Sequence, residues 1–136
     1  KLALFAAVVG QEQLMVAMEV NAAAAGSDEP GPVKALTACG DAYVRAMQAP
    51  GRRQLLLVDA PAVLGRERLA QHATRGSAAL VELVRAAIAA KAIRVVPAEP
   101  LAALLQALFD RAAQASPAEL SDYRKAIKAL IRGLKD

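Results

Sequence analysis

One short segment, residues 52–65 (RRQLLLVDAPAVLG), divides the sequence into two groups of helices. A run of four apolar residues ends in Asp59, an Ala-Pro pair follows, and Gly65 closes the segment. Proline has no backbone N–H and its ring clashes with the preceding turn, so a helix that reaches Pro61 has to stop or bend. We therefore expect a joint at this point, with helices on both sides of it.

Helical periodicity fills the rest of the chain, because apolar residues recur three or four positions apart. Two valines before Pro97 are β-branched, but they have no partner strand and we expect an extended link. The fold class predicted is all-α, an antiparallel bundle of about six helices. Apart from the joint, the expected helices cover Leu2–Ala25 and residues 32–48, 66–93, 100–112 and 116–134.

The length of 136 residues suits one domain with one core, and we treat residues 1–136 as that domain. Hydrophobic residues make up 56% of the chain but aromatic residues only 3%, and many of the hydrophobic residues are alanines. Alanine forms helices well but buries little surface, so such a core often needs a partner surface.

The charge distribution and the few residues suited to catalysis or metal binding argue against a nucleic-acid-binding face, a zinc site and an enzyme. The net charge of +4 is spread over the chain, with a mild basic concentration in residues 124–135, which is typical of a solvated helix face. One cysteine, Cys39, excludes an internal disulfide, and one histidine, His72, leaves no zinc-ligand cluster. Nothing orients these two as nucleophile and base, and no phosphate-binding glycine loop is present. We expect no enzyme, no cofactor and no metal, and the single thiol fits a reducing cytoplasm.

The first residues imitate a secretion signal, with a lysine followed by LALFAAVV. Polar and charged residues at positions 11–13 and Glu19 interrupt the apolar segment, and no apolar run approaches the ~18 residues that span a bilayer. We therefore expect a soluble protein without a membrane partner. The first helix starts without a capping residue, from which we expect residues to precede it.

A pocket for an apolar ligand is one interpretation of the methionines, since methionine adapts to variable shapes. Tyr43 would orient the ligand, and Asp59 would either do so or cap the helix after Pro61. The alternative is that the methionines only fill the core. The predicted ligand-binding residues are Met15, Met18, Tyr43, Met47, Leu56 and Asp59.

The last two helices carry the clearest apolar stripes, each wide enough to pack against more than one neighbour. Two such hairpins from two chains would form a four-helix bundle, whereas stripes that face only their own core are an equally good explanation. The predicted dimer-interface residues are Leu101, Leu104, Leu105, Leu108, Ala112, Tyr123, Ile127, Leu130, Ile131 and Leu134.

Four phrases in this order resemble the tetracycline-repressor family of transcriptional regulators. The helix after the DNA-binding domain of that family begins with a phrase similar to KLALFAAVV, and its sixth-helix region is similar to RRQLLLVDAPAVLGRERL. The start of its eighth helix is similar to IRVVPAEPLAALLQALFDRAA, and its last helix to DYRKAIKALIRGLKD. One departure is Arg66, where many relatives carry an aromatic residue, so the ligand class is open.

The resemblance implies a cytoplasmic homodimer whose small, largely apolar effector controls operator binding, usually repression. Operator DNA would be bound only through a helix-turn-helix domain that precedes this chain. The resemblance makes Leu2–Ala25 the helix that transmits the signal, and residues 101–113 and 120–134 the dimer seam. A ligand-free helical dimerisation or interaction module is the alternative. An internal cavity with convergent polar groups would favour the regulator, and a solid core the module.

Overall fold

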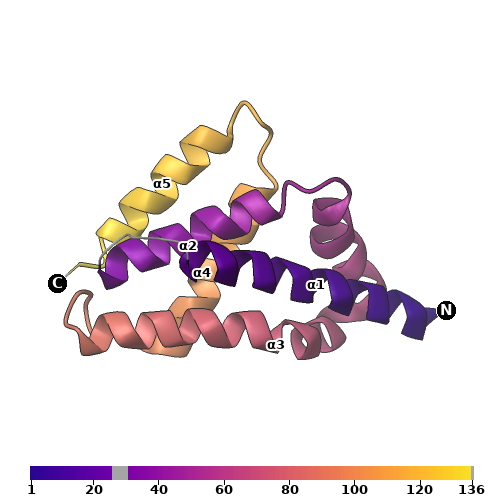
Figure 1. Cartoon of the computed structure of the whole chain (residues 1–136), viewed down its shortest axis with the longest axis horizontal. Helices are drawn as coiled ribbons and strands as arrows, with labels where there is room; N and C mark the ends of the chain where they lie inside the picture. The colour runs from indigo at the N-terminus through magenta and orange to yellow at the C-terminus, as the bar shows by residue number, and fades with distance from the viewer. Residues whose placement is uncertain (26–30, 136) are drawn as a thin grey trace.

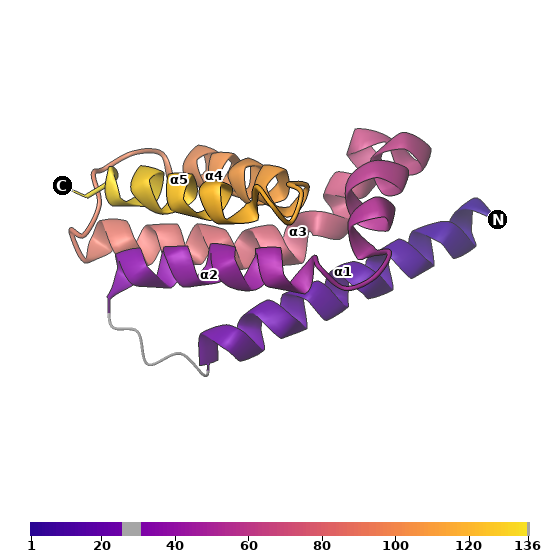
Figure 2. The same cartoon turned by 90° about the horizontal axis from the view of Figure 1, so that it is seen from above.

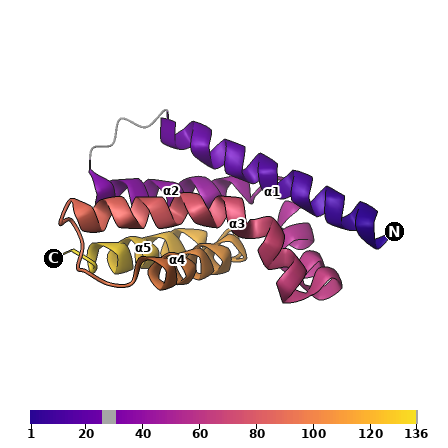
Figure 3. The same cartoon turned by 90° about the horizontal axis from the view of Figure 1, so that it is seen from below.

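The chain is all-α in the part that the computed structural model describes, which is residues 1–25 and 31–135 without the side chains of residues 24, 25, 66 and 68–77. The predicted fold class is thereby confirmed. The elements form three layers, with α1 outermost, α2 and α3 in the middle, and α4 and α5 on the far side (Figures 1, 2 and 3). Their order is α1 (Leu2–Ala25), α2 (Pro32–Ala46), η1 (Gln54–Asp59), α3 (Ala60–Ala89), α4 (Ala98–Ala113) and α5 (Leu120–Arg132).

The first core cluster lies between α2, α3, α4 and α5. It includes Leu36, Leu105, Phe109 and Ile131, all of them buried. On α4 the buried residues recur with the helical period, which turns one face of that helix inward. The apolar stripe predicted for this helix is therefore at least partly a stripe that faces the chain's own core.

A glycine inside α2 makes room for the largest residue of this core. A Cβ atom built on Gly40 would lie 2.9 Å from both Cδ1 and Cζ of Phe109. Real Cβ atoms do not approach other heavy atoms so closely, so the ring of Phe109 packs directly on the backbone of α2. Glycine normally weakens a helix interior, but here Gly40 is a packing position.

A second core cluster lies between α1, the end of α2, η1 and the start of α3. It includes Val9 and Val16 from α1, Met47, Leu56 and Leu64. Tyr43 is packed against both clusters, so it lies where the two cores meet. This second cluster is the part of the fold in which we expected the ligand.

The joint between the helix groups is present, but Pro61 is not where the backbone turns. The segment before it, η1, is a π-helix, in which the Ala60 N–H bonds to the carbonyl of Leu55. This wider turn lets the chain pass into α3 with Pro61 in the first turn, where proline is tolerated. The change of direction comes at Gly65, whose φ of 76° and ψ of 166° are accessible to glycine.

Asp59 does not cap α3, so that alternative is wrong. Its backbone is already helical and its side chain makes no capping hydrogen bond. Its carboxylate accepts a hydrogen bond from Nε2 of Gln54 at 3.0 Å instead. The last helix, α5, begins at Leu120, four residues after the predicted start at residue 116. The Ser116 hydroxyl donates to the Glu119 carboxylate just before this helix.

The extended link before α4 pairs with the end of the chain through an isolated bridge between Ile93 and Lys135. The N–H of Arg94 donates to the carbonyl of Leu134 at 2.8 Å. The two valines that follow belong to no strand within the described residues, as expected. This contact ties the end of α5 to the loop between α3 and α4.

The first helix corrects one expectation. The segment Leu2–Ala23 is long and apolar enough to cross a membrane by length and composition, although the sequence analysis expected no such segment. The sequence analysis looked for an uninterrupted apolar run, and isolated polar residues interrupt such a run. They barely change the mean hydropathy of the segment, which remains high. In the structure α1 packs on α2, η1 and α3, and two of its glutamates form ion pairs with the rest of the chain.

Candidate functional site

Three of the six predicted ligand-binding residues come together. Met47 and Leu56 are buried in the second core cluster, and Tyr43 is packed against it. They lie between α1 and the segment that joins α2 to η1. This region is the candidate effector region of the chain.

The other three lie apart from that region. Met18 is 62% exposed and Met15 is also exposed, because the helical period of α1 turns them away from its buried valines. Asp59 is bonded to Gln54 near the surface. Because α1 carries apolar residues on all sides, the helical period of its sequence does not show which face is buried and which is exposed.

A half-buried polar cluster, which sequence analysis missed, lies beside the candidate effector region. The Tyr43 hydroxyl donates to Oδ1 of Asp110, and Nε2 of Gln106 donates to the same atom at 3.0 Å. Burial raises the pKa of Asp110, although the two donors act in the opposite direction. Burial and the neighbouring carboxylate also raise the pKa of Tyr43, so its hydroxyl stays protonated. The only sequence signal was a Gln and an Asp four positions apart in α4.

A second polar cluster attaches α1 to the loop before η1. Arg52 is 5% exposed and its guanidinium donates to Glu12 and Glu19 at 2.9 Å each, and to the carbonyl of Ala46 at 2.7 Å. Burial acts to lower the pKa of Arg52, but its two glutamate partners outweigh that effect and raise it. The two glutamates are seven positions apart, hence on one face of α1, which was the signal available in the sequence.

The predicted dimer-interface residues divide into three groups by burial. Leu105, Ala112 and Ile131 are covered within the chain. Leu104 and Leu130 are 65% and 56% exposed. The half-buried remainder consists of Leu101, Leu108, Tyr123, Ile127 and Leu134.

Tyr123 is half covered by a cation from the neighbouring helix. The guanidinium carbon of Arg111 lies 4.7 Å from the ring centroid, which is a cation–π geometry. The surface left for a partner therefore centres on Leu104 and Leu130 rather than on the whole stripe. Exposed alanines flank these two leucines, namely Ala103, Ala107, Ala126 and Ala129.

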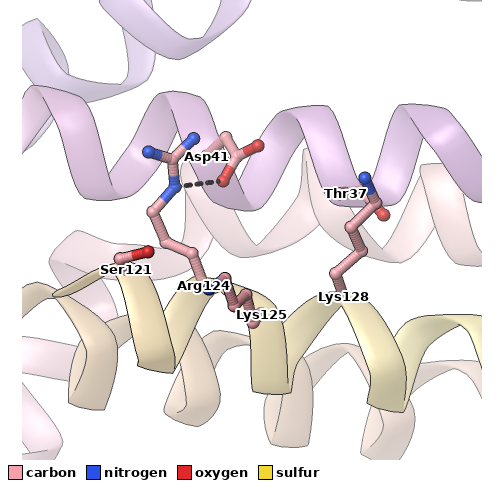
Figure 4. A pocket seen from close by; sticks show the side chains of 6 residues that line it. All are labelled: Thr37, Asp41, Ser121, Arg124, Lys125 and Lys128. Atoms are coloured by element: carbon pink, nitrogen blue, oxygen red, sulfur yellow. Dashed lines mark hydrogen bonds and ion pairs between the residues drawn. The ribbon is translucent and has the colours of Figure 1, made fainter. Parts of the chain in front are cut away.

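A polar groove of about 220 Å³ lies between α2 and α5. In Figure 4 Nε of Arg124 reaches from α5 to the carboxylate of Asp41 on α2, at 3.0 Å, and Lys128 extends toward Thr37. Sequence analysis treated the basic residues here as a solvated face. The residues that line the groove are Thr37, Asp41, Ser121, Arg124, Lys125 and Lys128.

Of the two residues considered for catalysis, Cys39 and His72, only Cys39 has a described side chain. Cys39 is half-buried and burial raises the pKa of its thiol, which lowers its reactivity. The side chain of His72 lies outside the described residues. No group of three or more potential metal ligands occurs among the residues described.

Most of the chain matches a known protein family. Residues 33–135 match a family model described as "Tetracyclin repressor-like, C-terminal domain". The match runs from the start of α2 to the end of α5, and α1 lies outside it. No curated protein matched the chain.

Proposed function

Because the chain belongs to the tetracycline-repressor-like C-terminal domain family, we propose that it is the regulatory domain of a ligand-responsive transcriptional regulator. In this proposal residues 1–136 form one domain that dimerises, binds a small apolar effector and acts without catalysis in the cytoplasm. Operator DNA is contacted by a helix-turn-helix domain outside this chain. Family membership and the all-α architecture support the regulatory role.

The observation that carries the dimerisation part is the exposed apolar surface shared by α4 and α5. Leu104 and Leu130 are among the most exposed large apolar side chains of the described residues. The opposite face of α4 is buried, whereas α5 is fully buried only at Ile131. Large exposed leucines flanked by alanines allow two helix pairs to approach closely, as in a four-helix bundle. The isolated chain would bury them by pairing with a second copy about a two-fold axis.

The effector part rests on the region around Met47, where α1 meets the segment between α2 and η1. An effector that enters there has to displace the packing of α1. Such a ligand changes the position of α1 only if it binds the displaced arrangement better than the packed one. Arg52 gives this coupling a route, since it holds two glutamates of α1 from the loop beside Met47.

One observation favours the alternative of a ligand-free helical module. Met47 is completely buried and Leu56 almost so, which means that the candidate effector region is filled by the chain's own side chains. An effector would therefore have to open this region rather than occupy a ready cavity. The two functions share the dimer and differ only in ligand binding.

The dimerisation proposal is tested by measuring mass in solution by light scattering. We expect the wild-type chain to have twice the mass of its 14.1 kDa protomer at micromolar concentration. Leu130→Glu should give a monomer, because a buried carboxylate without a partner is costly at the centre of an interface. Val95→Glu is the matched control, since Val95 is 85% exposed but lies outside α4 and α5. A monomeric wild-type chain, or a dimeric Leu130→Glu variant, would contradict the proposed surface.

Ligand binding is tested by methyl NMR, since the chain has three methionines and all belong to the predicted site. With ¹³C-labelled methionine methyl groups, a set of small apolar compounds should shift the Met47 signal. The exposed Met18 serves as an internal control for non-specific contact. If no compound moves Met47 while the chain remains dimeric, the ligand-free module is the better description.

A further inference from the structure

One flank of α5 carries basic residues from Arg124 onward, and Figure 4 shows two of them, Arg124 and Lys128, reaching toward α2. The single acidic side chain of the helix, Asp122, lies on the opposite flank by the helical period. The basic residues lie three or four positions apart and continue just past the helix, namely Arg124, Lys128, Arg132 and Lys135.

This arrangement is unfavourable without a counter-charge. Like charges four positions apart on a helix repel each other, as Arg124 and Lys128 do, and Lys128 and Arg132 do again. The whole chain has a net charge of only +4, so this flank carries as much positive charge as the chain has in excess. In the described residues no ion pair joins Lys125 or Lys128 to an acidic side chain.

The groove between α2 and α5 concentrates this charge and supplies oriented donors. Asp41 accepts from Nε of Arg124, which fixes the guanidinium and leaves its two terminal NH₂ groups available. Ser121 adds a hydroxyl at the start of α5. The Thr37 hydroxyl donates to the carbonyl of Val33 at 3.3 Å, so it contributes no donor to the groove.

We propose that the groove between α2 and α5 binds the phosphoryl group of a small phosphate monoester. Arg124 would bind two of its oxygens side by side, and Lys128 would bind from the other end of the groove. Three cations and one carboxylate line the groove, which leaves two positive charges for a phosphoryl group that carries nearly two negative ones at neutral pH. This site is separate from the effector region and does not depend on the proposed dimer.

A small ligand and a polymer would use different parts of the basic flank. A small phosphate monoester would contact only the cations that line the groove. A nucleic acid backbone would instead use the full length of the basic flank, including Arg132 and Lys135. The two possibilities therefore differ in which cations matter.

The test is a titration of the ¹⁵N-labelled chain, followed by amide chemical shifts, at constant ionic strength of about 0.15 M. Inorganic phosphate and methyl phosphate are the two probes, which distinguishes a free anion from a monoester. We expect saturable shifts at Thr37, Ser121 and Arg124, with methyl phosphate at least as effective as inorganic phosphate. Lys128→Gln and Arg124→Gln should each weaken binding about fivefold, less than at a buried site because the side chains are half in solvent.

Arg132→Gln is the matched control, because it removes the same charge from the same flank outside the groove. It should leave the affinity nearly unchanged, and all three variants should keep the unfolding temperature of the wild type. Equal shifts with chloride would overturn the proposal by reducing the site to an adventitious ion only. Equal loss in Arg132→Gln, or tighter and salt-sensitive binding of a single-stranded oligonucleotide, would overturn it in favour of an extended polyanion surface.

Discussion

The packing of Phe109 on Gly40 makes the substitution Gly40→Ala a quantitative test of the fold. In an exposed helix this change stabilises by about 1 kcal/mol, because alanine is the better helix former. Here the new methyl group would overlap the Phe109 ring, with Cδ1 and Cζ both 2.9 Å from the Cβ position. The ring is fully buried and cannot withdraw without disturbing its neighbours, one of which is Tyr43 at a centroid distance of 6.5 Å.

Overpacking of this kind costs about 1–3 kcal/mol, and overlap with several ring atoms places Gly40→Ala toward the upper end of that range. After subtraction of the helix-propensity gain, we expect a net loss of about 1–2 kcal/mol in the free energy of unfolding. The measurement is urea denaturation followed by circular dichroism. It should be done at a fixed protein concentration, because the proposed dimerisation would make the midpoint depend on concentration.

The control is the same substitution in a Phe109→Leu background, where the ring is gone. There Gly40→Ala should stabilise the chain, by up to about 1 kcal/mol, so the two substitutions should be coupled by about 2–3 kcal/mol. A neutral or stabilising effect of Gly40→Ala in the wild type would refute the packing argument. An equal effect in both backgrounds would refute it as well.

Three further predictions concern Arg52, which is buried, and Asp110 and Cys39, which are half-buried. Arg52→Gln should lower the free energy of unfolding by about 1–3 kcal/mol, because the carboxylates of Glu12 and Glu19 and the carbonyl of Ala46 lose their donor. The Glu19 carboxylate is half exposed, which keeps the loss within this range. An unchanged urea midpoint would contradict this prediction. Burial raises the pKa of Asp110 in the fold, so its contribution to stability is complete below the unfolded pKa of about 3.9 and is lost as pH rises through the folded pKa. Asp110→Asn should remove that pH dependence of the free energy of unfolding. If the curves of stability against pH were the same for the variant and the wild type, Asp110 would not be its source. Burial also raises the pKa of the Cys39 thiol, so its reaction with a disulfide reagent at pH 8 should be slow in the folded chain and fast in urea; equal rates would contradict this.

Helix positions were predictable because they depend on local sequence. The bounds of α1 are as expected, Leu2–Ala25, whereas α5 begins at Leu120, four residues after its expected start. Apolar residues three or four apart leave few alternatives for such segments. The order of the phrases was also sufficient for the family, which the match over residues 33–135 bears out.

The sequence did not predict the backbone at Pro61 correctly, because more than one backbone geometry accommodates a proline there. Pro61 requires that the preceding turn be altered, but a stop, a bend and a π-helical turn all meet that requirement. The chain uses the π-helical turn and bends at Gly65 instead. Sequence alone could not choose among these, because all three satisfy the local requirement set by proline.

The candidate sites depend on which side of each helix the rest of the chain covers. The period of α1 does not say that its valines are buried and Met18 exposed, and the stripe on α4 does not say that Leu105 is covered while Leu104 is not. Nor does the sequence bring Asp41 to Arg124 across 83 positions. The sequence by itself determined that the chain forms helices of a regulatory-domain family, because propensity and period act within a few residues. Only the tertiary structure decided which faces are core, groove or free surface, because contacts between distant segments set burial.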